Sequence, residues 1–327
     1  MNAFRWWWGL LLAFSGIALI RLFLPLPFAI EIIIFSIYTM GCNFLLGRVG
    51  FISFGQPAYL AVGAYGAAFY LFYFGTNAYV GILVGIAAGI IVSLVVGALF
   101  VRLRSDYFAL VNLALAVIIY YLMQKVLAGI THGDNGLWFL TSLASTPILD
   151  LSRPDQFFIF AFLVAFAIWA FYKYIDDSIF GACCLASKIN EDKLTFLGYS
   201  NFSIRLAAFV IANTTTALAG AMYAVYLGFV SPEITSPGRA ADPVVVTILG
   251  GVGTLYGPIV GSLAYIGMKD LISKVVGNWE LIIGFGLVII MLAGERGIWG
   301  TLEPLLKKSF FRGAAPGGTA RAEGRIK

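Results

Sequence analysis

Eight long apolar stretches follow one another along this chain of 327 residues, and they constrain its fold more than any other feature. A helix needs about 20 apolar residues to cross the hydrocarbon core of a membrane. Strands with open edges are excluded there, because lipid cannot satisfy their hydrogen bonds. We therefore predict an all-α integral membrane protein, a polytopic helical bundle of about eight spans. The predicted spans are 6–24, 27–46, 57–74, 78–101, 107–127, 156–175, 204–228 and 279–300.

The composition excludes most other classes of protein. Hydrophobic residues make up 61% of the chain and charged residues 11%, whereas soluble domains carry about 25% charged residues. A soluble enzyme and a disordered chain are therefore excluded. The three cysteines are Cys42, in an apolar span, and the adjacent Cys183 and Cys184. This spacing fits neither a metal site nor a disulfide framework, so we expect reduced, inert thiols.

A further apolar segment, 243–273, is broken by glycine and proline. Gly250, Gly251 and Gly253, with a nearby Gly-Pro pair, interrupt any helix placed here, because glycine is flexible and proline lacks an N–H. Residues 47–57 form a similar break in the first half, and paired breaks indicate a transport pathway. We predict that 243–273 is re-entrant and that the three glycines line the pathway. Two tight loops between helices are the alternative.

The distribution of Lys and Arg predicts the orientation. With the N-terminus inside and 243–273 entering from outside, 15 of the 21 basic residues lie on the cytoplasmic side, in line with the positive-inside rule. A single crossing by 243–273 would divide them 10 against 11. We therefore predict that both termini are cytoplasmic. Residues 1–304 form the transmembrane domain, and 305–327, which hold the whole net charge of +5, form a basic, disordered cytoplasmic tail.

Three neutral polar residues, Gln56, Asn112 and Asn213, lie within or beside the predicted spans. Each can hydrogen-bond a zwitterionic solute, so we predict that they line the translocation pathway. Hydrogen bonds between helices are the alternative role. Acids such as Glu31 and Asp242 fall near span ends. Because the sequence shows no buried acid or histidine relay, we do not expect energy coupling by protons.

The sequence shows no catalytic pattern. It has no Ser/His/Asp set, no H-E-x-x-H helix and no Walker A loop. Asp176 and Asp177 lack the second acidic cluster that a metal–diphosphate site needs, so we interpret them as a solvated span end. We predict no catalytic site, no metal site and no cofactor bound by this chain. If transport uses ATP, another chain binds it.

Residues 176–203 form the longest polar segment predicted between spans on the cytoplasmic side. Asn190 suits a helix N-cap followed by Glu191 in the first turn, and Gly198 suits a left-handed C-terminal stop. We predict two short amphipathic helices, broken at Asn190, that need a partner surface. A helix on lipid headgroups is the alternative, which the few basic residues disfavour. The apolar side is predicted to hold Ala182, Leu185, Ala186, Ile189, Leu194 and Leu197, and the predicted docking residues are Gly181, Leu185, Ile189, Asn190, Glu191 and Gly198.

Six short motifs follow one another over roughly residues 30–303. They are Gly50-x2-Ser53-x-Gly55-x2-Ala58-x4-Gly63-Ala64-Tyr65; Arg102-Leu103-Arg104 with Tyr107-Phe108-Ala109; Thr131-x-Gly133-x2-Gly136-Leu137; Phe180-Gly181 with Asn190-Glu191 and Gly198; Ala219-Gly220-Ala221 with Ser231-Pro232; and Gly250-Gly251-x-Gly253-Thr254-x2-Gly257-Pro258-x2-Gly261. In this order and spacing, they resemble the inner-membrane permeases of branched-chain amino-acid ABC importers, in their LivM-like branch.

The resemblance implies a permease without enzymatic activity that imports branched-chain or other small amino acids across the bacterial inner membrane by alternating access. Its implied partners are a homologous second permease, two ATPase subunits that bind ATP and Mg, and a periplasmic or extracellular substrate-binding protein. The small amino acid and the lipid bilayer complete the set, and no nucleic acid is expected. The 176–203 segment is similar to the loop that docks on the ATPases.

Departures from the family pattern leave alternatives open. Residues 182–188 read ACCLASK where the family is rich in arginine, which affects the electrostatics of ATPase docking. Asn112 stands where threonine is common, which leaves open a permease for urea or short amides. An ATP-independent channel or facilitator for small neutral solutes is the alternative from another class, and it would not need the 176–203 segment.

Overall fold

The computed structural model describes residues 25–103, 105–139, 149–274, 284–285 and 297–301. Six of its helices are long and apolar enough to cross a membrane, and they confirm as helices the six spans predicted between 27 and 228. The other two predicted spans, 6–24 and 279–300, lie wholly or mostly outside the described residues, as does the predicted tail. The six are α2 (Leu26–Phe44) with η1 (Leu45–Val49), α3 (Gln56–Phe69) with η2 (Tyr70–Phe74), α4 (Ala78–Phe100), α5 (Ser105–Tyr121) with η3 (Leu122–Val126), α7 (Pro154–Asp176) and α10 (Asn201–Leu227).

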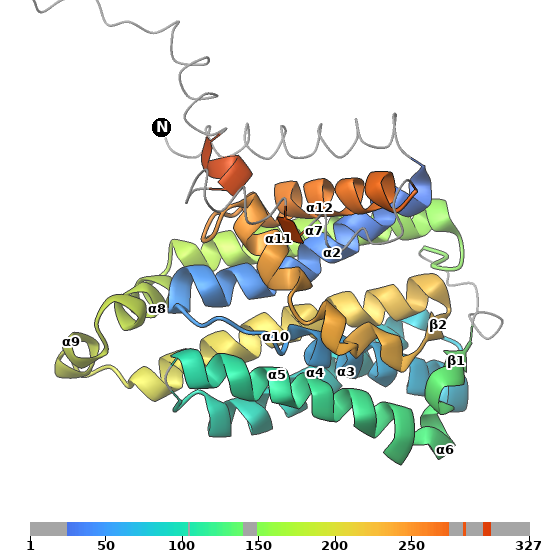
Figure 1. The fold of residues 1–327 in the computed structure, drawn as a ribbon, viewed down its shortest axis with the longest axis horizontal. Helices are drawn as coiled ribbons and strands as arrows, with labels where there is room; N and C mark the ends of the chain where they lie inside the picture. The colour runs from blue at the N-terminus through green and yellow to red at the C-terminus, as the bar shows by residue number, and fades with distance from the viewer. Residues whose placement is uncertain (1–24, 104, 140–148, 275–283, 286–296, 302–327) are drawn as a thin grey trace, which may run out of the picture.

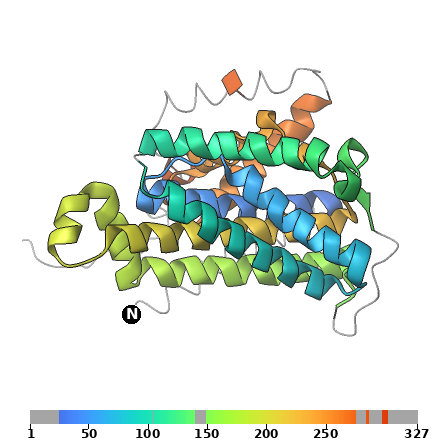
Figure 2. The ribbon, with the colours of Figure 1, turned by 90° about the horizontal axis from the view of Figure 1, so that it is seen from below.

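The long helices run along a common direction, so the bundle has two distinct ends (Figures 1 and 2). At the first, which we call the α8–α9 end, α8 (Ile179–Ile189) and α9 (Glu191–Phe196) project beyond the bundle. At the other, the β1–β2 end, β1 (Leu137–Trp138) pairs antiparallel with β2 (Phe229–Val230), with Leu137 opposite Val230. The remaining short elements are α6 (Ala128–Thr131), η4 (Gly133–Asn135), η6 (Pro232–Thr235), η7 (Pro237–Arg239), α11 (Asp242–Gly250) and α12 (Gly257–Ser273).

Small residues let α3 and α4 approach α10 closely. A side chain at Gly63 of α3 would place its Cβ 1.9 Å from the Ala217 carbonyl oxygen of α10, and one at Gly220 of α10 would place it 1.9 Å from the Leu60 carbonyl oxygen. Gly89 of α4 faces the Ala217 side chain in the same way. The helix backbones touch at these points, so a larger residue would push the helices apart.

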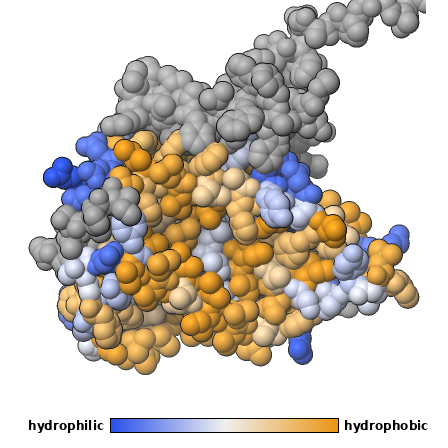
Figure 3. Space-filling model, turned by 180° about the vertical axis from the view of Figure 1, so that it is seen from behind, coloured by the Kyte–Doolittle hydropathy of each residue, from blue (hydrophilic) through white to orange (hydrophobic). Residues whose placement is uncertain are grey.

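The outer surface of the bundle is apolar. On α4, Leu83, Ile91, Val95 and Leu99 are between 61% and 67% exposed. Figure 3 shows apolar side chains over most of the face seen from behind. An apolar surface of this extent is costly in water and suits contact with lipid. The structure therefore supports a multi-pass membrane protein.

The segment predicted to be re-entrant forms two helices with a break between them. α11 ends at Gly250, residues 251–256 are not helical, and α12 begins with Pro258 in its first turn. Gly251 and Gly253 have φ values of 116° and 74°, which favour glycine. The turn between the helices lies toward the α8–α9 end (Figure 1), and both helices pack on α2. The break is confirmed, and its re-entrant path through a membrane stays a prediction.

Candidate functional site

The 176–203 segment folds into two short helices, as predicted. Ser178 caps α8 by accepting a hydrogen bond from the Gly181 N–H at 3.3 Å. Asn190 separates the helices and caps α9, because its Oδ1 accepts a backbone N–H at 3.0 Å. After α9, Gly198 has a φ of 85°, the left-handed conformation that the sequence predicts for it.

Large apolar side chains are exposed on and beside both short helices, and the predicted docking residues Leu185 and Ile189 are among them. Leu194, predicted on the same apolar side, is 2% exposed and packs into the bundle core, so that expectation is wrong. The extended backbone of Asn190 reorients α9, so helical spacing across the break does not continue one face. The exposed apolar set is Ile179, Leu185, Ile189, Phe196 and Leu197, exposed by 75%, 37%, 76%, 90% and 74%.

A polar cluster joins α8 and α9 to the first turns of α10. Glu191 forms an ion pair with Arg205 and accepts a hydrogen bond from Asn201 Nδ2 at 2.9 Å. Ser187 of α8 accepts a hydrogen bond from Arg205 Nε at 3.0 Å and donates to Asn201 Oδ1 at 2.5 Å. These bonds hold both short helices to α10 as one unit.

α8 is also tied to the ends of α2 and α7. Lys188 Nζ donates hydrogen bonds to the carbonyl oxygens of Leu46 and Gly47 in η1, at 3.2 and 3.0 Å. Gly181 packs so closely on α7 that a Cβ there would lie 2.3 Å from the Ile175 carbonyl oxygen. A displacement of α8 would therefore strain contacts with both long helices.

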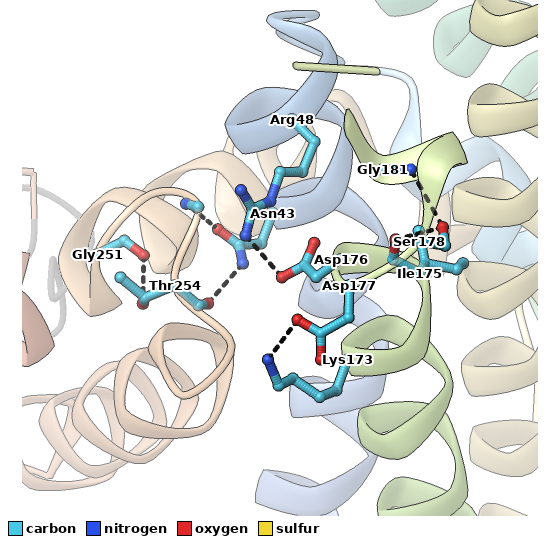
Figure 4. A network of polar contacts seen from close by, with 11 residues as sticks. Asn43, Arg48, Lys173, Ile175, Asp176, Asp177, Ser178, Gly181, Gly251 and Thr254 are labelled. Atoms are coloured by element: carbon cyan, nitrogen blue, oxygen red, sulfur yellow. Dashed lines mark hydrogen bonds and ion pairs between the residues drawn. The ribbon is translucent and has the colours of Figure 1, made fainter. Parts of the chain in front are cut away.

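A polar network links three parts of the bundle toward the α8–α9 end (Figure 4). Arg48 Nη2 and Asp176 Oδ2 form an ion pair at 2.6 Å between η1 and α7. Asn43 Nδ2 donates to the Thr254 carbonyl oxygen at 2.8 Å, and Asn43 Oδ1 accepts from the Gly253 N–H at 2.8 Å. The network thus fastens α2 to α7 and to the break between α11 and α12. We call these five residues the closing network.

The closing network corrects the interpretation of Asp176 and Asp177 as a solvated span end. The Asp176 side chain is 10% exposed and paired with Arg48, whereas Asp177 is 57% exposed and pairs with Lys173 at 2.9 Å. The solvated interpretation therefore holds only for Asp177. The network lines a cavity of about 20 Å³, which has room for a water molecule but not for an amino acid.

The predicted pathway residues Gln56, Asn112 and Asn213 are fully buried. Gln56 Oε1 accepts from Thr216 Oγ1 at 2.6 Å, and Asn112 Nδ2 donates to the Phe108 carbonyl oxygen at 2.9 Å. Gln56 Nε2, Asn112 Oδ1 and both amide atoms of Asn213 have no hydrogen-bond partner within the described parts of the chain. Such atoms cost about 1–3 kcal/mol each when buried, so bound water or a functional role is the usual explanation.

The other predicted pathway residues, Gly250, Gly251 and Gly253, lie across α2 from these amides. Gly47 of η1 packs on Gly253, while Gly41 of α2 packs on α10. The structure therefore divides the predicted pathway into two groups with α2 between them. Only the glycine group borders the closing network.

Comparisons with known proteins agree with one another. A profile of the family described as branched-chain amino acid transport system / permease component matches residues 24–292. The chain is 27% identical over 304 residues to the high-affinity branched-chain amino acid transport system permease protein LivM of Salmonella typhimurium, over 84% of the chain and 69% of that relative. LivM of Escherichia coli K12 is 27% identical over 314 residues, covering 87% and 71%. The permease protein LivH of Salmonella typhimurium is 26% identical over 174 residues, covering 52% and 54%. No solved structure matches the chain.

Proposed function

Because the chain belongs to the family of branched-chain amino acid transport permeases, we propose that it is the membrane-spanning subunit of an ATP-driven ABC importer for a branched-chain or other small amino acid. Its homologues are transport permease subunits rather than enzymes. In this proposal ATP and Mg bind to two partner ATPases, and this chain binds no cofactor. A second, homologous permease and a periplasmic or extracellular substrate-binding protein complete the importer.

The observation that carries the proposal is the exposed apolar set at the α8–α9 end. Ile189 and Phe196 are 76% and 90% exposed although α8 and α9 are firmly attached to the bundle. Exposed apolar side chains on short helices suit the groove of a partner protein. A channel that works without ATP needs no such surface. This surface is therefore where we place the ATPase.

The contacts around α8 supply a route from this surface to the closing network. Lys188 holds η1, which carries Arg48, and Ser178 caps α8 two residues after Asp176. Movement of α8 with the ATPase would pull on both partners of the Arg48–Asp176 ion pair. Breaking this pair costs about 2–4 kcal/mol, less than for a fully buried pair because Arg48 is 30% exposed. This is a large part of the roughly 5.5 kcal/mol that converts a 1:99 population into 99:1. The network is thus suited to act as the inner gate of alternating access.

The same proposal assigns the sides of the bacterial inner membrane. The α8–α9 end is cytoplasmic and the β1–β2 end faces outward. The 243–273 segment is re-entrant from outside, since its break lies toward the α8–α9 end. With eight full spans, both termini are cytoplasmic, residues 1–304 form the permease domain, and 305–327 form a cytoplasmic tail.

The test is ATP-dependent uptake by proteoliposomes that contain the permease pair, the ATPases and the binding protein. We expect Leu185→Asp to reduce ATPase affinity about 5- to 1000-fold, because anchors of such interfaces are worth about 1–4 kcal/mol, and to abolish uptake. Thr195→Asp is the matched control, because it adds the same charge to an exposed polar position of α9. If uptake continues without ATP, and the Leu185→Asp variant transports at the normal rate, the protein is instead a facilitator.

A further inference from the structure

A second cavity, of about 100 Å³, lies toward the β1–β2 half of the bundle. Four ionisable side chains line it: Glu31 in the second turn of α2, Arg239 at the end of η7, Asp242 at the start of α11 and Lys269 near the end of α12. The sequence places Glu31 and Asp242 separately near span ends, and the structure brings both to one cavity. Tyrosines and aliphatic side chains form the rest of its wall.

Both signs of charge face this cavity. Neither the Glu31 nor the Arg239 side chain forms an ion pair or hydrogen bond with another residue in the described ranges. Tyr223 also lines the cavity and interacts electrostatically with both of them. Asp242 accepts a hydrogen bond from the Tyr265 hydroxyl at 2.8 Å. Glu31 is half-buried and Arg239 is exposed, and ionisable groups that face a cavity of a membrane protein are usually kept for function.

We propose that this cavity binds the zwitterionic α-amino acid itself, with its carboxylate on Arg239, its ammonium group on Glu31 and its apolar side chain on Ile34 and Ile266. A guanidinium matches a carboxylate well. Ile34 and Ile266 are each 3% exposed and belong to the cavity wall. A solute with only one charge would leave either Glu31 or Arg239 without its charge-assisted hydrogen bond, so the site favours zwitterions.

This inference rests on the proposed transport of amino acids, and it adds a binding site within the permease. A lipid headgroup that carries both an ammonium group and a phosphate has the same chemistry. Binding is therefore measured in nanodiscs of phosphatidylglycerol alone and in nanodiscs that contain phosphatidylethanolamine. Leucine binding that persists in phosphatidylglycerol supports the amino acid as the ligand. Stabilisation of the protein by phosphatidylethanolamine without any leucine binding would overturn it.

The decisive experiment titrates the full-length permease with L-leucine and with two analogues, 4-methylpentanoate, which lacks the amine, and isopentylamine, which lacks the carboxylate. We expect each analogue to bind the wild-type protein about 10- to 100-fold more weakly than leucine, as for the loss of one charged hydrogen-bonding partner. Arg239→Gln should weaken the binding of leucine by a similar factor and leave the binding of isopentylamine unchanged. Glu31→Gln should weaken the binding of leucine and leave the binding of 4-methylpentanoate unchanged. A merely structural role of either residue would not produce this crossed pattern.

Lys274→Gln is the matched control, because Lys274 is 67% exposed, pairs with Asp270 and lies outside the cavity wall. Equal binding of all three ligands by the wild-type protein would overturn the site, as would unchanged leucine affinity in both variants. The binding assay contains no ATPase, so its outcome is separable from that of the proposed importer. If uptake is driven by ATP but both variants bind leucine normally, the proposed binding site is wrong and the importer proposal stands. If the crossed pattern is found but uptake does not depend on ATP, the importer proposal is wrong and the binding site stands.

Discussion

The two halves of the bundle each contain a cavity. At the α8–α9 end, Asn43, Arg48 and Asp176 join three parts of the bundle around a cavity of about 20 Å³. In the opposite half, a cavity of about 100 Å³ lies between α2, α10 and α12. Charges are present in both places. At the closed end they pair with each other, and in the larger cavity Glu31 and Arg239 form no ion pair within the described residues. The comparison shows that the charges at the α8–α9 end pair with each other, whereas Glu31 and Arg239 in the larger cavity do not pair within the described residues.

The first prediction gives an all-or-none result and would break this comparison if the sides were reversed. Asn135→Cys, at the β1–β2 end, should react with a membrane-impermeant thiol reagent in intact cells, and Gly318→Cys should not. Asp192→Cys, which is exposed on α9, should react only after the membrane is opened. Labelling of Gly318→Cys in intact cells would contradict the eight-span topology with a re-entrant segment.

The second prediction concerns the ion pair of the closing network. Arg48→Ala should cost about 2–4 kcal/mol, somewhat less than for a fully buried pair, because the Arg48 side chain is 30% exposed. We expect a lower unfolding midpoint in detergent and leucine leakage from proteoliposomes without ATP. The control Lys173→Ala breaks the pair with Asp177, whose side chain is 57% exposed, and should cost less than about 1 kcal/mol.

A double variant separates stability from gating. In Arg48→Ala/Asp176→Ala no charge is left unpaired, so the unfolding midpoint should return most of the way to that of the wild type. Leakage should persist, because the contact between η1 and α7 is still absent. A double variant that does not leak leucine would show that the ion pair only stabilises the fold.

Local features of this protein were predictable from sequence, and contacts between distant segments were not. The break after Gly250, the cap at Asn190 and the left-handed Gly198 follow from the chemistry of the residues themselves. Arg48 and Asp176 are 128 residues apart, and no local rule connects them. Their best sequence signal is an arginine in a glycine-rich break and an acid at the end of a span.

The cavity of about 100 Å³ and Leu194 illustrate the same limit. Glu31 and Arg239 line one cavity although they lie far apart in the sequence, so hydropathy alone does not connect them. Leu194 follows the helical spacing of α8, yet its direction is set by the turn at Asn190 and by packing on the core. Spacing predicts an apolar side within one helix, but tertiary contacts decide which side it faces.

The third prediction compares two buried asparagines that differ in their hydrogen bonds. Asn213→Leu removes an amide without a partner among the described residues, so the free energy of unfolding should stay the same or rise by about 1 kcal/mol. Asn43→Leu removes two hydrogen bonds of the closing network and should lower it by about 1–3 kcal/mol. Unfolding midpoints and uptake are measured together. Reduced uptake with intact stability in Asn213→Leu would assign this residue to the pathway, and a joint loss would assign it a structural role.

The last prediction has the smallest effect and uses a native residue as a reporter of the closed end. Desolvation by burial raises the pKa of the Cys184 thiol in α8 to about 12; the nearby Cys183 and Asp176 add to the rise and Arg48 opposes it. The raised pKa keeps the thiol protonated at pH 8, and the thiolate is the reactive form. Cys184 should therefore be alkylated far more slowly than the cysteine of Asp192→Cys. Both rates are measured in a Cys42→Ala/Cys183→Ala background. If the ATPase moves α8 away from Arg48 and Asp176, water reaches the thiol, its pKa falls toward 9 and the alkylation rate rises. An equally slow rate with and without ATP would mean that the closed end opens without movement of α8.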